Sequence, residues 1–433
     1  MCARAGHSLQ LLAFGHGWGF PGSLHCYNPN TKVAILTNPF RRASPPDLSR
    51  RPTSRPIDQP DLLRVAEEDR RLPWLGLEQL VHLDPAGRGL ASFRRSAEPL
   101  DAGQLRTVAV HIAQHARAVG IVTGFCATSS GRVTAETDGP PGALFLARAL
   151  LTIGVDVYLI SDAYGLPLLQ VGCELWNLDR RMLVEIPFED GTANCPARMS
   201  NDPDLNTKTD RWVREFFASE RGQQLSHLIA IERPGPSHTL DSLALQTRSS
   251  ASPTDDFANQ VSAEHQNVCH NMRGGSINDL TAKSHRLFEY IREQRLPITT
   301  IGIGDGGNEI GMGKFPWEQL VEAIGSAAAG RNACRLATDF TLIAGVSNWG
   351  AYALALAIGK LRGTEASCDW QPSHQRALIE AMVQRAGAID GLTLRPESTV
   401  DGLPLDVYLQ PLVEMRKLLG ISDSPRSDST YPG

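Results

Sequence analysis

The chain is 433 residues long, 42% of them hydrophobic and 21% charged, and its formal net charge is -5. Such a length accommodates two or three average domains, or equally one large α/β unit with extensions. The apolar content is enough for a substantial core, and the longest apolar stretches stop well short of a membrane-spanning run, which predicts a soluble protein with no membrane partner. No basic field is present to attract phosphate backbones, so nucleic acid is not an expected partner.

The eight cysteines are widely scattered and form no CxxC pair, which argues against a zinc knuckle or a redox motif. Reduced thiols in an intracellular compartment are the simplest interpretation. Cys126 follows an apolar run, and it would be a nucleophile only beside a base that the sequence does not reveal.

The N-terminal region differs in composition from the rest of the chain. Through Arg55 it carries seven Lys or Arg and a single acid, Asp47. Mitochondrial transit peptides share this bias with ordinary disordered leaders, and the lack of a clear amphipathic period fits a loose leader or an uncertain start. We predict a poorly ordered leader and linker over 1–60, a single α/β domain over 61–420 and a tail over 421–433.

From Leu105 onward, short apolar runs alternate with helical patterns. The runs predict strands at 120–125, 155–160, 182–187, 227–232, 298–304 and 340–345. Helices are predicted at 105–118, 141–153, 206–221, 277–294, 316–325 and 350–361. This alternation predicts a mainly parallel sheet with helices on both faces, a three-layer, Rossmann-like α/β fold. The polar stretch 236–266 nearly lacks aromatic residues, so we predict a flexible, disordered insertion there.

Polar motifs follow five of the apolar runs directly. Open α/β sheets bind ligands beyond the carboxyl ends of their strands, so these motifs should share one cleft. They are Thr123-Gly124-Phe125, Ser161-Asp162-Ala163, Glu232-Arg233, Gly304-Asp305-Gly306-Gly307-Asn308-Glu309 and Ser347-Asn348-Trp349-Gly350.

The Gly-rich segment 302–314 carries the densest signal. Its glycines permit positive φ and close backbone approach, so free N–H groups can point at an anion beside Asp305, Asn308 and Glu309. A plain turn, capped by its Asp and Asn, is a simpler interpretation of the same residues.

A dinucleotide loop is the third interpretation of this segment. Gly302, Gly304 and Gly307 satisfy the GxGxxG spacing. The predicted strand lies late in the chain, however, and no partner acid follows at the usual distance from an early βαβ unit.

Segment 136–142 supplies a second group of acids. Asp138 is placed to cap the helix that is entered through two prolines, and capping explains this residue as well as catalysis does. Capping does not explain Glu136, and Thr137 offers a further hydrogen-bonding group. Paired acids near one cleft suit a divalent cation or divided general-acid and general-base roles.

Two arginines and a histidine pair are further candidates. The planar fork of Arg233 or Arg273 suits a carboxylate, although a surface ion pair is the more common fate of an arginine. His111 and His115 have the i, i+4 spacing of metal ligands but lack the acid of HExxH, so we interpret them as helix surface residues.

Several of these motifs, in this order, resemble the signature blocks of the D-glutamate cyclase C-terminal domain family. They are 123–125, 136–142, 230–233, 271–273, 302–314 and 344–350, and Asp401-Gly-Leu-Pro404 resembles a further segment. The likeness spans residues 62 to 415 and implies a lyase that interconverts D-glutamate with 5-oxo-D-proline, in mitochondria for the animal members. The chain departs from the family pattern at His270, where a Tyr is expected, and in its leader, where the animal enzyme has a large additional domain.

The resemblance and the residue chemistry together define an expected site for D-glutamate. Proton transfer is assigned to four acids, Asp305, Glu309, Glu136 and Asp138, of which the first two are alternatively ligands of a divalent cation, Mn²⁺ or Mg²⁺. The expected substrate-binding residues are Thr123, Gly124, Thr137, Arg233, Asn271, Arg273, Gly306, Gly307, Asn308 and Asn348. Arg233 or Arg273 would hold the α-carboxylate, while the Gly-rich N–H groups and Asn308 would stabilise the tetrahedral oxyanion.

Two other functions stay open, a nucleotide-binding oxidoreductase or transferase and a non-catalytic protein that binds acidic amino acids. Orientation supplies much of the rate of closing a five-membered ring, so a lyase here needs no covalent cofactor. The lyase hypothesis requires segments 136–142 and 302–314 to meet at one end of one sheet, close enough for both to contact one small diacid. The sequence indicates no oligomeric state.

Overall fold

The structure of the chain, a computed structural model, describes residues 59–95, 97–189, 207–246, 254–364 and 371–421. The leader predicted over 1–60 and the tail predicted over 421–433 lie almost wholly outside these residues. The first described helix is α1 (Gln59–Arg71).

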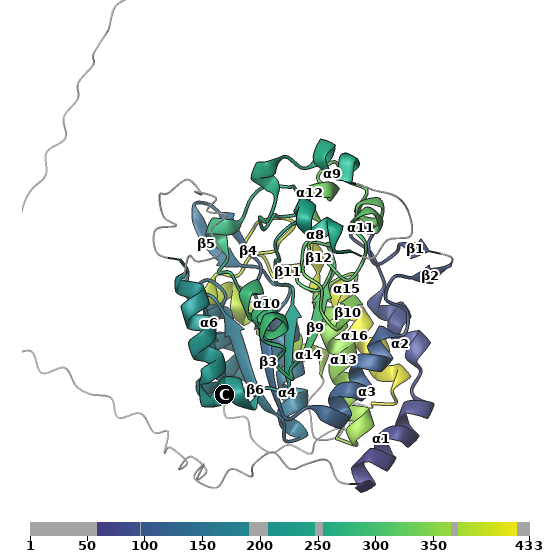
Figure 1. The fold of residues 1–433 in the computed structure, drawn as a ribbon. Helices are drawn as coiled ribbons and strands as arrows, with labels where there is room; N and C mark the ends of the chain where they lie inside the picture. The colour runs from purple at the N-terminus through teal and green to yellow at the C-terminus, as the bar shows by residue number, and fades with distance from the viewer. Residues whose placement is uncertain (1–58, 96, 190–206, 247–253, 365–370, 422–433) are drawn as a thin grey trace, which may run out of the picture. The chain divides into compact units, whose positions relative to one another are not determined.

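A six-stranded parallel sheet forms the centre of the described chain (Figure 1). Its strands are β3 (Ala118–Thr123), β6 (Asp156–Ser161), β7 (Leu183–Glu185), β8 (His227–Ile231), β9 (Thr299–Gly304) and β10 (Phe340–Ile343). In space they run β10-β9-β8-β3-β6-β7, and every neighbouring pair is parallel. The strand order therefore reverses between β3 and β8, as in doubly wound folds, whose ligands bind at that reversal.

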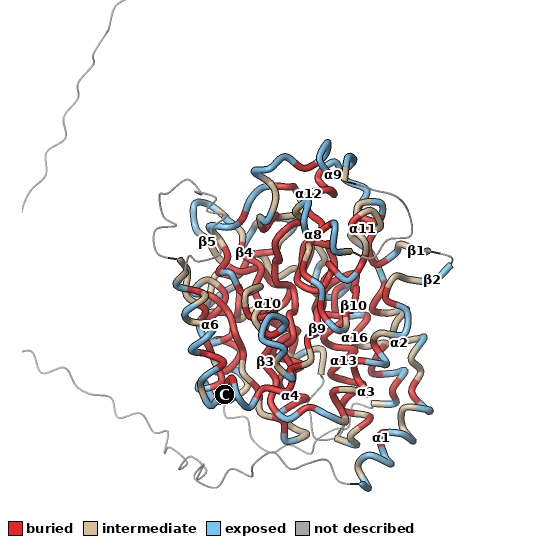
Figure 2. The backbone as a smooth tube through the Cα atoms, viewed as in Figure 1, coloured by how far each residue is buried: buried red, intermediate tan, exposed pale blue. Residues whose placement is uncertain are grey.

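Alternate residues of the central strands supply two separate cores. Val119 and Ile121 of β3 point into one core, whereas Ala118 and Val122 point into the other. One face of the sheet is covered by α3 (Gln104–His115), α4 (Pro140–Thr152), α5 (Leu166–Leu175) and α13 (Ser347–Arg362). The other is covered by α6 (Lys208–Ala218), α10 (His285–Gln294) and α11 (Trp317–Ile324). The buried layers in Figure 2 follow this arrangement, which confirms the predicted three-layer α/β fold.

Shorter elements surround these layers. The helices are α2 (Trp74–Val81), α7 (Glu220–Gln224), α8 (Leu240–Ala244), α9 (Thr254–Gln260), α12 (Ala329–Asn332), α14 (Pro372–Ala381), α15 (Leu405–Tyr408) and α16 (Gln410–Leu418). Three antiparallel ribbons pair β1 (Arg94–Arg95) with β2 (Glu98–Pro99), β4 (Cys126–Ser129) with β5 (Arg132–Ala135), and β11 (Thr399–Val400) with β12 (Leu403–Pro404). Across the described ranges, no helix combines the length and the apolar character that crossing a membrane requires.

Two predicted helices differ from the observed ones because side chains intervene. The helix predicted over 206–221 is divided at Ser219, whose extended backbone ends α6 and whose Oγ accepts the Gly222 N–H that begins α7. The helix predicted over 277–294 begins only at His285. Before it, the Ala282 N–H donates 3.2 Å to Asp162 Oδ2, a tertiary bond that replaces a helical one.

The stretch 236–266 was predicted to be a disordered insertion, and its described parts are instead folded. They form α8 and α9 together with a short 3-10 turn at Ala263–His265. Phe257 is fully buried, with its ring centroid 5.4 Å from that of Trp317, and Leu243 is also fully buried. These apolar anchors outweigh the polar composition on which the prediction depended.

Candidate active site

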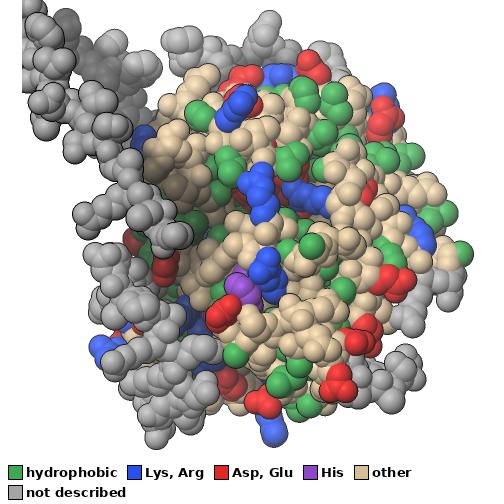
Figure 3. Space-filling view, turned by 90° about the horizontal axis from the view of Figure 1, so that it is seen from above, with side chains coloured by type: hydrophobic (Ala, Val, Ile, Leu, Met, Phe, Trp, Pro, Cys, Tyr) green, Lys and Arg blue, Asp and Glu red, His purple; other side chains and the backbone are tan. Residues whose placement is uncertain are grey.

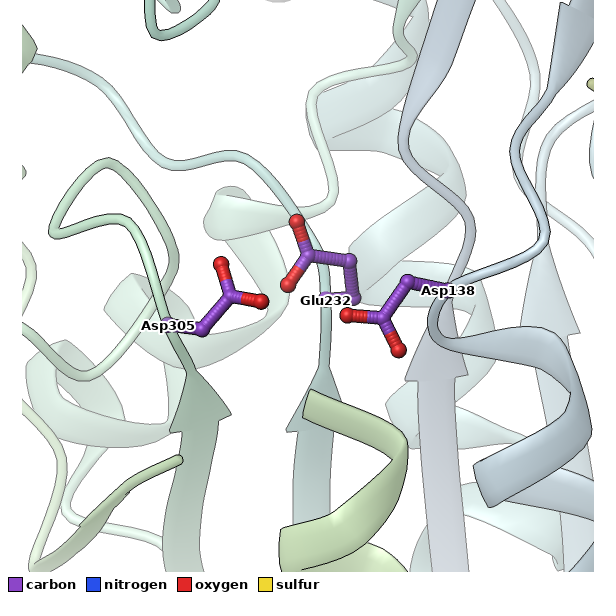
Figure 4. A group of neighbouring side chains, drawn as sticks. All are labelled: Asp138, Glu232 and Asp305. Atoms are coloured by element: carbon purple, nitrogen blue, oxygen red, sulfur yellow. The ribbon is translucent and has the colours of Figure 1, made fainter. Parts of the chain in front are cut away.

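Three carboxylates meet at the point where the strand order reverses (Figure 4). Asp305 follows β9, Glu232 follows β8, and Asp138 follows β3 after the β4–β5 ribbon. One oxygen from each of the three lies within 4.8 Å of the others. The two segments that the sequence singled out, 136–142 and 302–314, therefore do converge at one end of the sheet.

Asp138 is held by the N-terminus of α13. Its Oδ2 accepts the Ser347 N–H at 2.9 Å, and its Oδ1 accepts the Asn348 N–H at 2.9 Å. Capping of the helix entered through prolines does not explain Asp138, because α4 begins at Pro140 with Gly139 as its N-cap residue and has no side-chain cap. The carboxylate instead joins segment 136–142 to α13, and the positive end of that helix favours its ionised form.

Glu232 has a strained backbone. Its φ is 44°, in the left-handed region, which costs roughly 1–2 kcal/mol for a residue with a side chain. The Glu232 N–H donates to Ile303 O at 3.0 Å, and the Ser347 hydroxyl donates to Oε2 at 2.6 Å. Strain of this kind is retained where the surroundings over-determine it, most often at functional sites. The sequence placed Glu232 in a polar motif directly after a strand, but we assigned it no role in the site.

Asp305 is buried yet poorly bonded. Among the described residues, neither of its oxygens accepts a hydrogen bond of good geometry. Its contact with a cation is an ion pair between Oδ1 and the guanidinium of Arg88. The same guanidinium lies 2.5 Å from Oδ1 of Asp401, so Arg88 links two acids from distant parts of the chain.

Arg88 reaches the acids from the loop that follows α2. Its side chain is 19% exposed, whereas those of Asp305 and Asp401 are 1% and 2% exposed. Asp84 fixes the loop by accepting the backbone N–H groups of Arg88 at 2.9 Å and of Gly89 at 2.8 Å. Seen from above (Figure 3), basic side chains border a hollow near the middle of that face, with acidic atoms behind them.

Glu136 and Asp401 extend the acidic group. Glu136 is 8% exposed, and its carboxylate presses so closely on Gly391 that a Cβ there would lie 1.8 Å from Oε2. Asp401 has a φ of 53°, and its Oδ2 has no hydrogen-bond partner in the described part of the chain. We call the five carboxyl groups the acid cluster: Glu136, Asp138, Glu232, Asp305 and Asp401.

Burial makes the acid cluster proton-rich. Burial raises the pKa of Asp305 to about 6 and that of Asp401 to about 7, in both cases against the lowering effect of Arg88. Burial and neighbouring carboxylates raise the pKa values of Glu136, Asp138 and Glu232 well above their usual range. Groups that titrate near neutrality can both accept and donate protons, which is the property that acid–base catalysis needs.

The carboxylate of Glu309 stabilises the Gly-rich turn by hydrogen bonds to its backbone. Its Oε1 accepts the Gly306 N–H and its Oε2 accepts the Gly307 N–H, each at 2.8 Å. This corrects one expectation, since those N–H groups are engaged and not open to an oxyanion. Among the described residues, the acids whose oxygens lie together with those of Asp305 are Asp138 and Glu232. Asn308 donates Nδ2 to His270 O at 2.7 Å, while its buried Oδ1 has no partner among the described residues.

Other expected substrate ligands hold the site together. Asn348 Oδ1 accepts the N–H groups of Gly139 and Gly142, and its Nδ2 donates to Thr137 O. The Thr137 hydroxyl donates to Thr399 O at 2.7 Å. Thr123 differs from these, because its buried Oγ1 has no hydrogen-bond partner in the described chain.

Arg233 is a structural cross-link, contrary to the role expected for it. It is fully buried, and it donates to Gly124 O, Asp162 Oδ2, Ala282 O and Ser284 Oγ at 2.6–3.0 Å. A guanidinium with four such bonds has little capacity left for a substrate carboxylate.

Arg273 and Asn271 lie at the surface turn that follows His270. Arg273 is exposed and donates to Leu392 O at 3.0 Å. Asn271 Oδ1 closes the turn by accepting the N–H groups of Arg273 and Gly275. Neither residue belongs to the acid cluster.

The remaining candidates lie apart from the acid cluster or are inert. Burial raises the pKa of Cys126 well above its usual range, so the thiolate required of a nucleophile is disfavoured. His111 contacts His227 at 3.1 Å between ring nitrogens, at the beginning of β8 and hence at the opposite end of the sheet. His115 is the exposed neighbour of this pair.

The donor set of the acid cluster suits a hard divalent cation. Mg²⁺ and Mn²⁺ prefer carboxylate oxygens, and three of these lie together on Asp138, Glu232 and Asp305. Oδ1 of Asp305 contacts the Arg88 guanidinium, whereas its buried Oδ2 has no hydrogen-bond partner in the described part of the chain, which leaves that oxygen available to a ligand. The residues present therefore fit such a cation, with Asp138 and Glu232 as partners of Asp305 in place of Glu309.

Two comparisons with known proteins show what the chain is similar to. A family model described as D-glutamate cyclase-like, C-terminal, matches residues 77–265 and 257–416. The human protein named D-glutamate cyclase, mitochondrial, is 29% identical over 289 residues, which cover 65% of this chain and 38% of the human protein. The chain thus spans well under half the length of that relative. Because this model covers most of the chain, the protein belongs to the family described as D-glutamate cyclase-like, C-terminal.

Proposed function

We propose that the protein is a lyase that closes D-glutamate to 5-oxo-D-proline with loss of water. The observation that carries the proposal is the acid cluster around a single guanidinium at the strand-order reversal. Membership of the family and the name of the human relative support the choice of substrate.

The proton balance of the reaction matches a proton-rich site. The ammonium group of the zwitterion must lose two protons, one before its nitrogen attacks the γ-carboxyl carbon and one afterwards. The departing oxygen must gain two protons to leave as water, so the overall reaction consumes none. Asp305 and Asp401 titrate near neutrality and are suited to carry these protons from nitrogen to oxygen.

The acid cluster also offers complementary partners for the substrate. Its carboxylates attract the ammonium group, and Arg88 is the guanidinium that contacts them. Protonation of Asp305 or Asp401 weakens its ion pair with Arg88, which frees N–H donors for the α-carboxylate. We assign to Arg88 the role that sequence reasoning gave to Arg233 or Arg273.

A divalent cation, Mn²⁺ or Mg²⁺, fits this proposal. Asp138, Glu232 and Asp305 would hold it. Such a cation would neutralise charge on the γ-carboxylate and make that group a better electrophile. The other contribution of the chain is orientation, because Ser347 fixes Glu232 and the α13 N-terminus fixes Asp138.

The nucleotide-dependent alternative has less support, since the glycines of segment 302–314 pack the turn against itself. A Cβ on Gly302 would lie 2.3 Å from Ile310 O, and a Cβ on Gly304 would lie 2.7 Å from Glu309 Oε2. Close packing of this kind explains the glycines without a phosphate.

We also propose a mitochondrial location. The name of the human relative supports it, and so does the Arg-rich composition of the leader.

The test is to incubate the purified protein with D-glutamate or L-glutamate, with and without a chelator, and to detect 5-oxoproline by mass. We expect the product from D-glutamate, and less of it after chelation. A protein that is stabilised by D-glutamate but never converts it would be a binding protein, and the proposal would then be wrong. Thermal-shift measurements with NAD and ATP address the nucleotide alternative.

A further inference from the structure

A cavity of about 250 Å³ lies beside α6 and α10, and its lining contains none of the acid cluster. The residues that matter most in its wall are Thr281, Lys283, His285, Arg286, Glu289 and Arg335. Its volume is below the roughly 300–1,000 Å³ of typical ligand pockets, which limits an occupant to a small molecule.

Cationic side chains outnumber carboxylates among the residues that line the cavity, Lys283, Arg286 and Arg335 against Asp210 and Glu289. Glu293 and Glu189 approach Arg286 and Lys283 from outside this lining, at 3.3 Å and 3.9 Å. Glu289 is shared by both arginines, at 2.5 Å from Arg286 and 2.6 Å from Arg335, and Arg286 Nε also donates to Asp210 Oδ1 at 2.7 Å. The two guanidinium groups are therefore held in place before any ligand arrives.

Lys283, at the edge of the cavity, is the least closely paired of these cations. Its side chain is 48% exposed, and its Nζ lies 3.9 Å from Glu189 Oε1, at the outer limit of an ion pair. The neighbouring His285 does not add a charge near neutral pH, because burial lowers its pKa to about 4. The ammonium group at the rim therefore has the longest ion pair among the cations of the wall, and it is the cation best placed to take a further anionic partner.

A buried hydroxyl in the wall points to a polar occupant. Thr281 is 4% exposed, and its Oγ1 has no hydrogen-bond partner among the described residues. Buried polar atoms nearly always have partners, so an unsatisfied one beside a cationic cavity indicates that a ligand supplies the bond. A hydroxyl donor next to fixed guanidinium groups is the combination that recognises an oxyanion.

We propose that this cavity is a second binding site, for a small oxyanion that carries a phosphate or carboxylate group. Thr281 donates its hydroxyl to the anion, Lys283 closes over it, and Arg286 and Arg335 supply the fixed positive field. The proposal does not depend on the lyase activity, because it concerns residues outside the acid cluster.

The test is isothermal titration calorimetry with inorganic phosphate and, separately, with acetate. The variants are Thr281→Val, which keeps the shape but removes the donor, and Lys283→Gln, which removes an exposed charge. The matched control is Lys417→Gln, because Lys417 is 65% exposed and pairs with Glu414 on α16. We expect at least one of the two anions to bind the unaltered protein, and each cavity variant to weaken that binding about tenfold. The control should bind as the unaltered protein does.

Three outcomes would overturn the proposal. They are an absence of binding for both anions, an equal loss in the control, and a loss that follows Arg88→Gln in place of the cavity variants. The last result would place the anion at the acid cluster. If Thr281→Val fails to fold, as circular dichroism would reveal, the exposed Lys283→Gln variant decides the question alone.

Discussion

Strand β8 has a buried titratable group at each end, and the two groups differ in their hydrogen bonding and in the strain of their backbone. At its beginning, His227 contacts Ser226 Oγ at 2.9 Å and His111 at 3.1 Å, and burial lowers its pKa to about 3. After its end, Glu232 has a strained backbone and lies beside Asp305, whose Oδ2 has no hydrogen-bond partner among the described residues. A buried group whose bonds are satisfied stabilises the fold, whereas buried groups left unsatisfied together indicate a site of binding or chemistry.

The largest effect on turnover is expected for Asp305→Asn. The change is nearly isosteric and removes a proton carrier and a cation ligand, so we expect turnover of D-glutamate to fall by about 10³-fold or more. Thermal melting should remain close to that of the unaltered protein. Asp406→Asn is the matched control, because Asp406 is an acid with a side chain that is 87% exposed. Unchanged turnover in Asp305→Asn would remove this residue from the mechanism.

Arg233→Gln should have a large effect on stability. It removes one partner of a fully buried ion pair with Asp162, so we expect a loss of about 3–5 kcal/mol in the free energy of unfolding. Denaturant titration measures this loss. Unimpaired stability together with a raised KM would restore Arg233 as a substrate ligand and contradict its assignment as a cross-link.

Arg88→Gln should affect substrate use with a smaller cost in stability. Because Arg88 is partly exposed and its guanidinium contacts Asp305 and Asp401, we expect about a 10²-fold fall in kcat/KM, expressed mainly in KM. Arg88→Lys keeps the charge but loses the fork, and it should recover part of that fall. Steady-state kinetics with D-glutamate separates these results. An unchanged KM in both variants would exclude Arg88 from binding the α-carboxylate.

The pH dependence of stability tests whether the pKa values of Asp305 and Asp401 are raised in the folded protein. Asp305 and Asp401 have pKa values raised to about 6 and about 7, so the folded protein binds their protons more tightly than the unfolded chain does. This contribution to stability is complete below about pH 4, the unfolded value, and is lost as the pH rises through about 6 to 7. Without metal, the melting temperature of Asp305→Asn should fall less across this range than that of the unaltered protein. Parallel profiles would show that Asp305 titrates normally.

The smallest effect is expected at the beginning of β8. His111→Gln removes one ring contact with His227, so we expect a loss of about 1 kcal/mol in stability and no change in turnover. Melting curves and the 5-oxoproline assay check both parts. A large loss of activity would show that this end of the strand also serves the reaction.

The sequence predicted the layers of the fold well because their cause is local. Apolar strands alternate with helices along the chain, and this alternation predicts a parallel sheet independently of the conformation of the loops. It also placed Asp138 and Asp305 at one end of the sheet, since polar motifs directly after strands must meet there.

The parts of the site that sequence reasoning missed have non-local or geometric causes. Arg88 lies in a loop without periodicity, and its partners Asp305 and Asp401 lie far away in the chain. Glu232 is distinguished by a left-handed backbone that no pattern reveals. Glu309 was misassigned because its carboxylate folds back onto the glycines beside it, which a motif cannot display.

The most direct test of the account follows the oxygen atom. Ring opening of 5-oxo-D-proline in water enriched in ¹⁸O, the reverse of the proposed closure, should place the label on the γ-carboxylate of D-glutamate when the unaltered protein or Asp406→Asn is present. Asp305→Asn should leave the label at background. Equal labelling by Asp305→Asn, or no labelling by the unaltered protein with either cation added, would contradict the claim that the acid cluster interconverts these two molecules.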